Sequence, residues 1–365
     1  MGRTLTERDI EAAVRGGSVY AAGGGGWSEH GRMLGGAAVR LGKPELVSVD
    51  ELDPEAIVAT AAAIGAPAGT TAWEMQGIDY IRAAQMLQDA LGRKLAGFMV
   101  GQNGRSSTLN GWLPAVALGS VVVDAVGDMR AHPTGDMGSI GMAGSPAETI
   151  QTAAGGNRSE GRYIELVVRG ATAKVSPILR AAADMAGGFI ASCRNPVTAA
   201  YVKRNAALGG ITLALTLGEA ILAAEGKGGA AIIDTICKAT KGQIIAEGGI
   251  TRKAVAYTKQ AFDIGTITLG TGAKASMLHV MNEYMAVDDA DGVRVATFPD
   301  VITTLDAQGE PVSVGQLREG MTVFVLHVPK SVIPLAPGLR DPGLYVPVEA
   351  ALGIEIARYA LSEDA

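Results

Sequence analysis

The sequence lacks the features that a nucleic-acid-binding or membrane-embedded protein would need. Its 31 Lys and Arg are outnumbered by 37 Asp and Glu, the net charge is −6, and no run of basic residues occurs. A nucleic-acid partner is therefore not expected, and five Phe with three Trp provide few rings on which bases could stack. No glycine-free apolar run is long enough to cross a bilayer, so we expect no membrane contact either.

Cysteine is scarce as well. Cys193 and Cys237 lie far apart and form no CxxC pair, which argues against a disulfide framework and a zinc knuckle. Both stand in apolar surroundings that are typical of a protein core. The first residues carry acidic side chains and no apolar segment, so they do not resemble a signal peptide. These absences favour a protein of the reducing cytoplasm.

Glycine and apolar residues are abundant instead. Glycine occurs 50 times among 365 residues and apolar residues make up 48%, which indicates a globular chain. Strand-like and helix-like segments alternate as far as residue 126, which predicts a Rossmann-like, parallel α/β domain over residues 1–168. After further helices, short alternating segments separated by turns predict an α+β domain rich in antiparallel strands over residues 169–365.

Several local elements are expected from turn residues and apolar periodicity. A capping box at Thr6 begins a helix that Gly16-Gly17 should end, and residues 18–22 then read as a short strand. Helix starts are also expected at Ser176-Pro177 and at Asn195-Pro196. Within the second domain, the segments 230–239 and 277–287 are both interpreted as strands.

Four consecutive glycines, Gly23–Gly26, follow the first expected strand. Without side chains the backbone can approach a ligand closely, so Gly24, Gly25 and Gly26 are candidates for binding substrate. A tight turn packed against the sheet explains them equally well. Glu29 occupies the third glycine position of a dinucleotide fingerprint and no Walker motif occurs, so neither NAD nor ATP is expected as a cofactor.

A polar cluster follows the strand-like run 120–123. Asp124, Asp128 and His132 are spaced four apart, and carboxylates with imidazole can bind a divalent metal, with zinc as our first choice. The alternative is a solvated loop in which Arg130 pairs with a carboxylate. Arg130 could instead bind a substrate carboxylate through two hydrogen bonds.

Further polar candidates stand elsewhere in the chain. Asn103 follows the strand-like run 96–100 and could polarise a carbonyl or cap a turn. Glu74 begins a helix, where a carboxylate is favoured with or without a catalytic role. Alternation along 277–287 places His279 and Glu283 on one face and Asn282 on the other, and a buried Glu283 would need a partner.

The order of these segments resembles the S-methyl thiohydantoin desulfurase family. The segments that carry the resemblance are GGGG at 23–26, GAPAGTTAWE at 65–74, GQNG at 101–104, VVVDAVG at 121–127, residues 226–250, NEYMA at 282–286 and residues 298–329. The resemblance covers nearly the whole chain. It implies hydrolytic chemistry on a small cyclic substrate, in which the methylthio group of a five-membered ring is replaced by oxygen. It also implies a possible hydantoinase/oxoprolinase-type partner.

The departures from the family pattern concentrate in residues 124–134, where the family usually has DADGMGRAFPE. Asp124, Gly127, Arg130 and Pro133 are kept, Val126 and Thr134 replace acidic residues, and Asp128 and His132 are new polar groups. Glu74, Asn103 and Asn282-Glu283 match the family, whereas the Glu that usually precedes the glycine turn near residue 101 is missing. The chain therefore resembles a divergent branch whose substrate could differ.

We expect a hydrolase in which an activated water attacks an sp² carbon of the ring. Asp124 is the expected base or metal ligand. Glu74 and His132 are expected to support Asp124. Asn103, Arg130 and the backbone N–H groups of the glycine loop would stabilise the developing negative charge. His279 or Glu283 would act as the acid toward the leaving group. The alternatives are an accessory subunit of a hydantoinase/oxoprolinase-type enzyme and a nucleotide-binding enzyme. If the protein is the hydrolase described above, we expect it to form a homo-oligomer.

Overall fold

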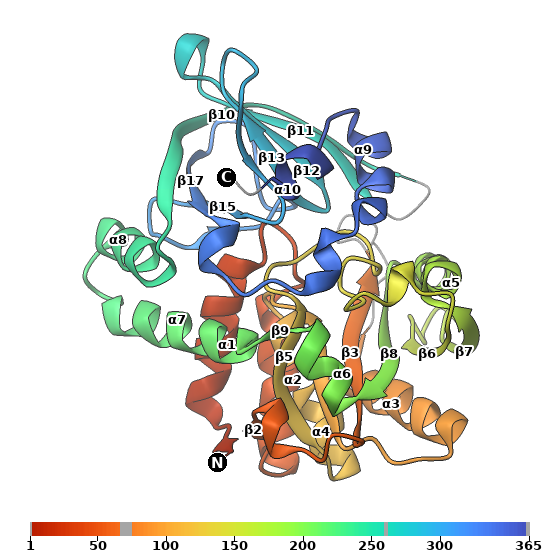
Figure 1. The fold of residues 1–365 in the computed structure, drawn as a ribbon. Coiled ribbons are helices and arrows are strands. Elements are labelled where there is room, and N and C mark those ends of the chain that lie inside the picture. The colour runs from red at the N-terminus through yellow and green to blue at the C-terminus, as the bar shows by residue number, and fades with distance from the viewer. Residues whose placement is uncertain (1, 66–74, 259–261, 363–365) are drawn as a thin grey trace.

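The computed structural model describes residues 2–65, 75–258 and 262–362. Two sheets lie one above the other in Figure 1, the first below and the second above. In spatial order the first sheet contains β1 (Arg3–Thr4), β2 (Glu45–Val47), β5 (Val121–Asp128), β4 (Gly97–Gln102), β3 (Ile57–Gly65), β8 (Phe189–Thr198), β6 (Glu148–Gly155) and β7 (Ile164–Ala171), with β9 (Ala207–Leu208) paired to β5.

The first sheet has a parallel part and an antiparallel part. Strands β2, β5, β4 and β3 pair in parallel with one another, as the alternation of strands and helices predicted. Strands β8, β6 and β7 extend this sheet with antiparallel pairs. The sheet therefore continues past residue 168, and the change to the second sheet comes after β9.

The second sheet is antiparallel throughout its described pairs, as predicted. Its spatial order is β14 (Arg294–Thr297), β13 (Glu283–Asp288), β12 (Ser276–Met281), β11 (Asp263–Leu269), β10 (Gln243–Tyr257), β17 (Thr322–Val328), β15 (Val301–Leu305) and β16 (Pro311–Val312). The expected fold class, an α/β domain followed by one rich in antiparallel strands, is confirmed.

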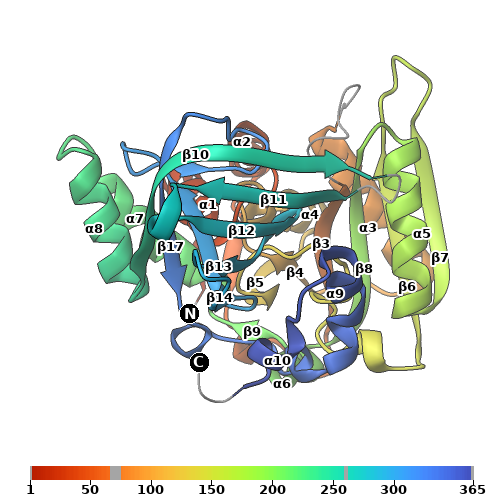
Figure 2. The same cartoon turned by 90° about the horizontal axis from the view of Figure 1, so that it is seen from above.

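Helices cover the first sheet and flank the second. They are α1 (Glu7–Tyr20), α2 (Ser28–Leu41), α3 (Gly77–Leu91), α4 (Trp112–Leu118), α5 (Thr172–Met185), α6 (Ala199–Asn205), α7 (Gly210–Ala224), α8 (Gly229–Thr240), α9 (Val346–Leu352) and α10 (Ala357–Ala360). Seen from above, α8 and α5 stand at opposite ends of the molecule (Figure 2). Within the described ranges, no helix is both long and apolar enough to span a bilayer.

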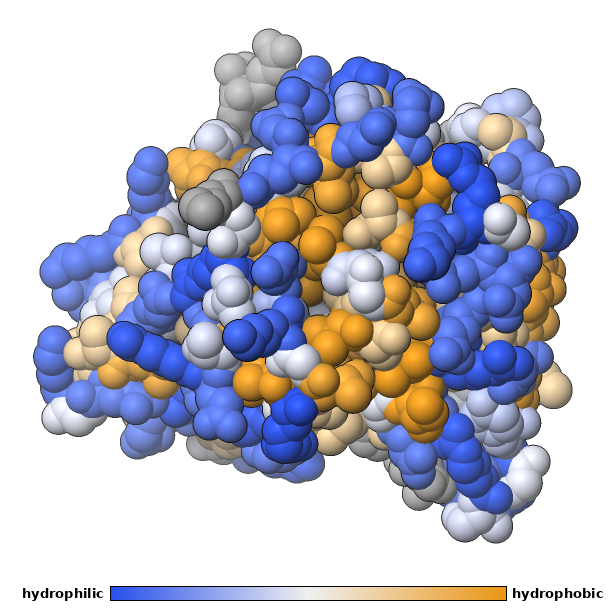
Figure 3. All heavy atoms as spheres, turned by 90° about the horizontal axis from the view of Figure 1, so that it is seen from below, coloured by the Kyte–Doolittle hydropathy of each residue, from blue (hydrophilic) through white to orange (hydrophobic). Residues whose placement is uncertain are grey.

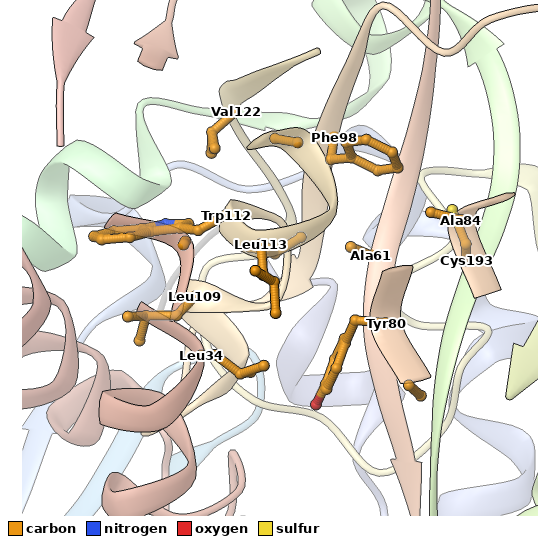
Figure 4. Packing of buried hydrophobic residues seen from close by; sticks show 14 of the residues in the cluster. Leu34, Ala61, Tyr80, Ala84, Phe98, Leu109, Trp112, Leu113, Val122 and Cys193 are labelled. Carbon is orange, nitrogen blue, oxygen red and sulfur yellow. The ribbon is translucent and has the colours of Figure 1, made fainter. Parts of the chain in front are cut away.

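The largest core lies between the first sheet and helices α2, α3 and α4. Phe98, Trp112 and Tyr80 are almost completely buried there among smaller apolar side chains (Figure 4). Burial of a side chain such as Phe98 stabilises the fold by roughly 1.5–3 kcal/mol. This packing fixes β3 and β4, whose carboxyl ends form part of the candidate site.

The glycines of α1 serve helix packing and do not end the helix. A Cβ at Gly16 would lie 1.8 Å from the carbonyl oxygen of Ala214 in α7, and one at Gly218 would lie 1.8 Å from that of Ala12. The glycines therefore let the two helices approach closely. The predicted helix end at Gly16-Gly17 and the predicted strand over 18–22 are wrong, because α1 continues to Tyr20.

Three other local predictions are wrong. Segment 230–239 forms α8, because a short apolar run fits a helix face as well as a strand. Asn195-Pro196 lies in β8, where the register with β3 shifts and Asn195 has φ 49°. Segment 277–287 is a hairpin of β12 and β13 that turns at Asn282, whose φ is 59°. In addition, α5 begins several residues before Ser176-Pro177.

Candidate active site

A cavity of about 70 Å³ lies at the carboxyl ends of β3 and β4, beneath the second sheet. Ligands bind at this edge in open α/β sheets. At roughly 15 Å³ per water the cavity has room for about four or five waters. Its lining includes polar side chains and glycines, among them Gly25, Gly26, Gln102, Ser106, His132, Arg180, Arg194, Asn282 and Glu283.

The glycine loop forms one wall of this cavity. The second sheet holds it: the Tyr284 N–H donates to the Ala22 carbonyl and the Val314 N–H to the Gly23 carbonyl, both at 2.9 Å. A Cβ at Gly24 would lie 2.1 Å from Glu283 Oε1. Gly24 therefore makes room for the Glu283 carboxyl, while Gly25 and Gly26 line the cavity, so the loop is a tight packed turn and a cavity wall at once.

Glu283 stands directly after the turn between β12 and β13. The turn is fixed by Asn282, whose N–H donates to the Asp263 carbonyl at 2.7 Å and whose Oδ1 accepts from the Asp263 N–H at 2.9 Å. Glu283 is 4% exposed, and its Oε2 has no hydrogen-bond partner among the described residues.

Burial raises the pKa of Glu283 to about 8, although the charges of Arg130 and Arg180 act in the opposite direction. At neutral pH the carboxyl is therefore mostly protonated. A protonated carboxyl at a cavity wall can donate a proton to a leaving group.

His132 and Asp128 form the opposite part of the site, at the end of β5. His132 Nδ1 lies 3.4 Å from Asp128 Oδ2, and within the described part of the chain neither atom has a hydrogen bond. Asp128 is fully buried and the His132 ring lines the cavity. A Cβ on Gly138 would lie 2.6 Å from Nε2 of His132, so this glycine leaves space for the ring. The carboxylate can orient the imidazole and stabilise its protonated form.

Two arginines on the cavity wall were not predicted. Arg194 in β8 donates from Nε to Gln151 Oε1 and from Nη2 to the Gly135 carbonyl, both at 3.1 Å. Arg180 in α5 donates to the Pro133 carbonyl at 2.9 Å. Burial lowers the pKa of each to about 10, so both remain cationic at neutral pH. For Arg194, the signal available in the sequence was a charged residue directly after the apolar run 189–193.

Arg130 lies behind the cavity and is fully buried. Its Nε donates to the Ala131 carbonyl at 2.8 Å and its Nη1 to the Asp300 carbonyl at 2.9 Å, while the guanidinium carbon lies 5.1 Å from the centre of the Phe298 ring. Burial lowers the pKa of Arg130 to about 10. It therefore contributes positive charge near Glu283 and joins the two sheets. Because Arg130 does not line the cavity, this placement does not support direct binding of a substrate carboxylate by Arg130.

Asp124 and Asn103 form structural hydrogen bonds away from the cavity. Asp124 Oδ1 accepts from the N–H groups of Ile211 and Thr212 at 3.0 and 3.1 Å, which caps the first turn of α7. Asn103 Nδ2 donates to the Gly210 carbonyl at 2.9 Å, and its Oδ1 accepts from Thr108 at 3.1 Å. Neither residue is among those that line the cavity, so this placement does not support a base or a carbonyl-polarising amide.

His279 belongs to a separate cluster in the second sheet. Its Nε2 lies 2.8 Å from Asp288 Oδ2, and Arg294 Nε donates to Oδ1 of the same carboxylate. Because β12 and β13 form a hairpin, the prediction that His279 and Glu283 share a strand face is wrong. Only Glu283 of the two lines the cavity.

The predicted metal ligands do not come together as a set of three. Across residues 2–65, 75–258 and 262–362, no three His, Cys, Asp or Glu side chains are placed to bind one metal ion. Asp124 is occupied in the helix cap, which leaves Asp128 and His132 as a pair. This ligand set therefore does not fit the expected zinc site. Glu74 lies outside the described residues.

Comparisons with known proteins agree with this architecture. Family models match the chain in two parts, the S-Me-THD-like N-terminal domain over residues 8–159 and the S-Me-THD-like C-terminal domain over residues 171–333. A crystal structure of a protein from Chromobacterium violaceum is similar, with a TM-score of 0.73 and 24% identity over 100% of this chain and 99% of the other. At this identity the likeness concerns the fold. No curated protein matches the chain.

Proposed function

The chain belongs to the S-Me-THD-like family, and on that premise we propose that it hydrolyses a hydantoin-type or thiohydantoin-type five-membered ring. The family itself suggests a desulfurase or hydrolase role on thiohydantoin. One observation carries the finer proposal: Glu283 and His132 line the same cavity of about 70 Å³, and Asp128 lies behind His132 at 3.4 Å from its Nδ1.

In the proposed reaction, water attacks the ring carbon that carries the methylthio group. His132 accepts one proton from the water while Asp128 stabilises the imidazolium. The carbon–sulfur bond then breaks with its electron pair on sulfur, and Glu283 protonates the sulfur to give methanethiol. The second water proton moves to the ring nitrogen as the new carbonyl forms, and the proton on His132 returns to Glu283 through water.

Positive charge on the cavity wall supports this step. The attack develops negative charge on the ring nitrogen and oxygen, and Arg180 and Arg194 both line the cavity as buried cations. Fixed charges of this kind stabilise a transition state strongly because water is excluded. The same groups would serve attack on an amide carbon, so cleavage of a ring C–N bond is the second reaction that we propose to test.

The test offers the purified protein two substrates, an S-methyl thiohydantoin and the matching hydantoin. We expect free methanethiol and hydantoin from the first, measured with a thiol reagent and by chromatography. Ring opening of the second would instead identify C–N cleavage. The absence of both products across a series of ring substituents would contradict the proposal.

A divalent metal, with zinc as first choice, remains an expectation from the sequence. Since the three predicted ligands do not assemble, we derive no step through a metal. Elemental analysis of the native protein, together with activity after treatment with a chelator, tests this expectation independently of the reaction.

We also propose that the protein works as a homo-oligomer in the cytoplasm. Figure 3 shows apolar side chains gathered at the centre of the face that lies at the bottom of Figure 1, with hydrophilic residues around them. Apolar patches are typical of protein contacts. Light scattering should give a multiple of 37.2 kDa. A monomer with low activity would favour the alternative, an accessory subunit of a hydantoinase/oxoprolinase-type enzyme.

A further inference from the structure

A second hollow shares a wall with the active-site cavity. Its volume is about 560 Å³, and it lies between α5 and α9, on the right-hand side of Figure 2. Residues that line both spaces are Thr134, Gly135, Ser176 and Arg180. The two hollows are therefore neighbours across one layer of side chains.

The difference in volume matters for the substrate. The cavity holds the equivalent of about four or five waters, so a five-membered ring would nearly fill it. A larger substituent on the ring has to extend beyond the cavity. The second hollow is several times larger and begins at the shared wall.

The shared wall is thin at Gly135. A Cβ there would lie 2.6 Å from Arg194 Nη1, so any larger residue would clash with the guanidinium. On the other side of the wall, the Arg180 guanidinium carbon lies 4.3 Å from the centre of the Phe262 ring. The Arg180 guanidinium thus lines both spaces, whereas its aromatic neighbour Phe262 lines the second hollow alone.

The second hollow is chemically unlike the cavity. Beyond the shared wall most of the lining is apolar, namely Pro177, Ala181, Met185, Phe262 and Pro347, and the carboxylates of Asp136 and Asp184 complete it. Met185, one of these residues, is 68% exposed. A third hollow, lined by Lys253, is a poorer candidate for an apolar substituent. Among the described residues it shares only Gly26 with the cavity, and the charged residues Arg105, Glu29 and Asp263 also line it.

We infer that the hollow between α5 and α9 binds an apolar substituent, such as a benzyl group, carried on the ring of the substrate. The inference rests on the proposed function and adds a substrate class to it. The ring occupies the polar cavity, the substituent leaves past Gly135 and Ser176, and the apolar residues on α5 and α9 enclose it.

The test compares Ala181→Trp, which fills the hollow, with Ile178→Trp as its matched control. Ile178 is 46% exposed on the same helix and is not among the lining residues. Each protein is assayed with S-methyl thiohydantoins that carry hydrogen or benzyl on the same ring carbon. The ratio of the two kcat/KM values is the readout, because a partial loss of folded protein cancels in it.

For the unaltered protein we expect the benzyl compound to be favoured about 10- to 100-fold, the range typical of an apolar subsite. Ala181→Trp should reduce this preference at least about tenfold, and Ile178→Trp should keep it. Equal kcat/KM values in the unaltered protein, or equal losses in both variants, would overturn the inference and leave the proposed hydrolysis standing.

A binding measurement separates the two proposals if neither substrate is turned over. Calorimetric titration then compares hydantoin with 5-benzylhydantoin. Tighter binding of the benzyl compound that is lost in Ala181→Trp and kept in Ile178→Trp would support the subsite while the hydrolysis fails. Equal binding of the two compounds, or no binding of either, would overturn the subsite as well.

Discussion

Two of the Asp–His pairs in this molecule have the same chemistry and opposite surroundings. His279 and Asp288 lie 2.8 Å apart within the second sheet, and Arg294 binds the other oxygen of the carboxylate. His132 and Asp128 lie 3.4 Å apart at the end of the first sheet, with no hydrogen bond to either facing atom in the described part of the chain. The first pair is satisfied, whereas the second faces a cavity.

The difference indicates what each pair can do. A pair whose facing atoms are hydrogen-bonded to each other fixes the positions of its strands, and neither His279 nor Asp288 lines the cavity. An unsatisfied pair at a cavity wall keeps its hydrogen-bonding capacity for a ligand, and catalytic hydrogen bonds are often long until the substrate binds.

The largest effect is expected for His132→Gln, which removes the proposed base. General base catalysis typically contributes 10²- to 10⁴-fold, so kcat should fall by about 10³-fold. The matched change His279→Gln should leave kcat within about twofold and lower the free energy of unfolding by about 1–3 kcal/mol, because Asp288 loses one partner in a mostly buried setting. Steady-state kinetics and urea unfolding measure the two effects, and a similar loss of kcat in both variants would contradict the contrast.

Asp128→Asn should come next, with kcat reduced by about 10²-fold and KM little changed. The amide keeps the shape of the side chain but cannot stabilise an imidazolium, so the loss falls on the chemical step. A rise in KM at constant kcat would instead assign Asp128 to binding. The pH profile of kcat/KM provides a second readout that a purely structural role would not change.

Glu283→Gln should lower kcat at neutral pH by about tenfold, less than the roughly 10²- to 10⁴-fold typical of a general acid, because a thiolate leaves readily even without a proton. With a pKa of about 8, the carboxyl donates below that pH and loses the ability above it. Activity of the unaltered protein should therefore decline as the pH rises through about 8, and this decline should be missing in the variant. A persistent decline in the variant would assign it to another group.

Asp124→Ala should have the smallest effect on catalysis. It removes the cap of α7 and should lower the free energy of unfolding by about 1 kcal/mol, while kcat stays unchanged. Thermal unfolding and a kinetic assay at the same temperature measure both. A large loss of kcat in a folded variant would return Asp124 to the reaction and contradict the assignment of chemistry to Asp128.

Much of the fold was predictable from the sequence because its signals are local. Apolar runs located β4 and β5, and turns between short alternating segments indicated a second domain of antiparallel strands. The errors arose where one local signal serves two purposes. Glycines at 16–17 can end a helix or let another helix approach, and only α7, some 200 residues later, decides between these uses.

The candidate site was predictable in position more than in detail. The loop after β5 and the glycine loop both line the cavity, as their sequences indicated. Asp124 and Asn103 could not be assigned in this way, because their partners are separated from them by 87 and 107 residues. Arg194 was missed for the same reason, since it reaches the cavity only through the pairing of β8 with β3 and β6.

The buried carboxyl of Glu283 makes folding a proton-uptake reaction. In the unfolded chain this group has an ordinary pKa of 4.5, whereas in the folded chain its pKa is about 8. Between these values the folded molecule holds a proton that the unfolded molecule lacks, so the free energy of unfolding decreases as the pH rises through this interval. Since the glycine loop meets this carboxyl only when the two sheets join, we expect that union to be favoured by mild acid and weakened by mild base.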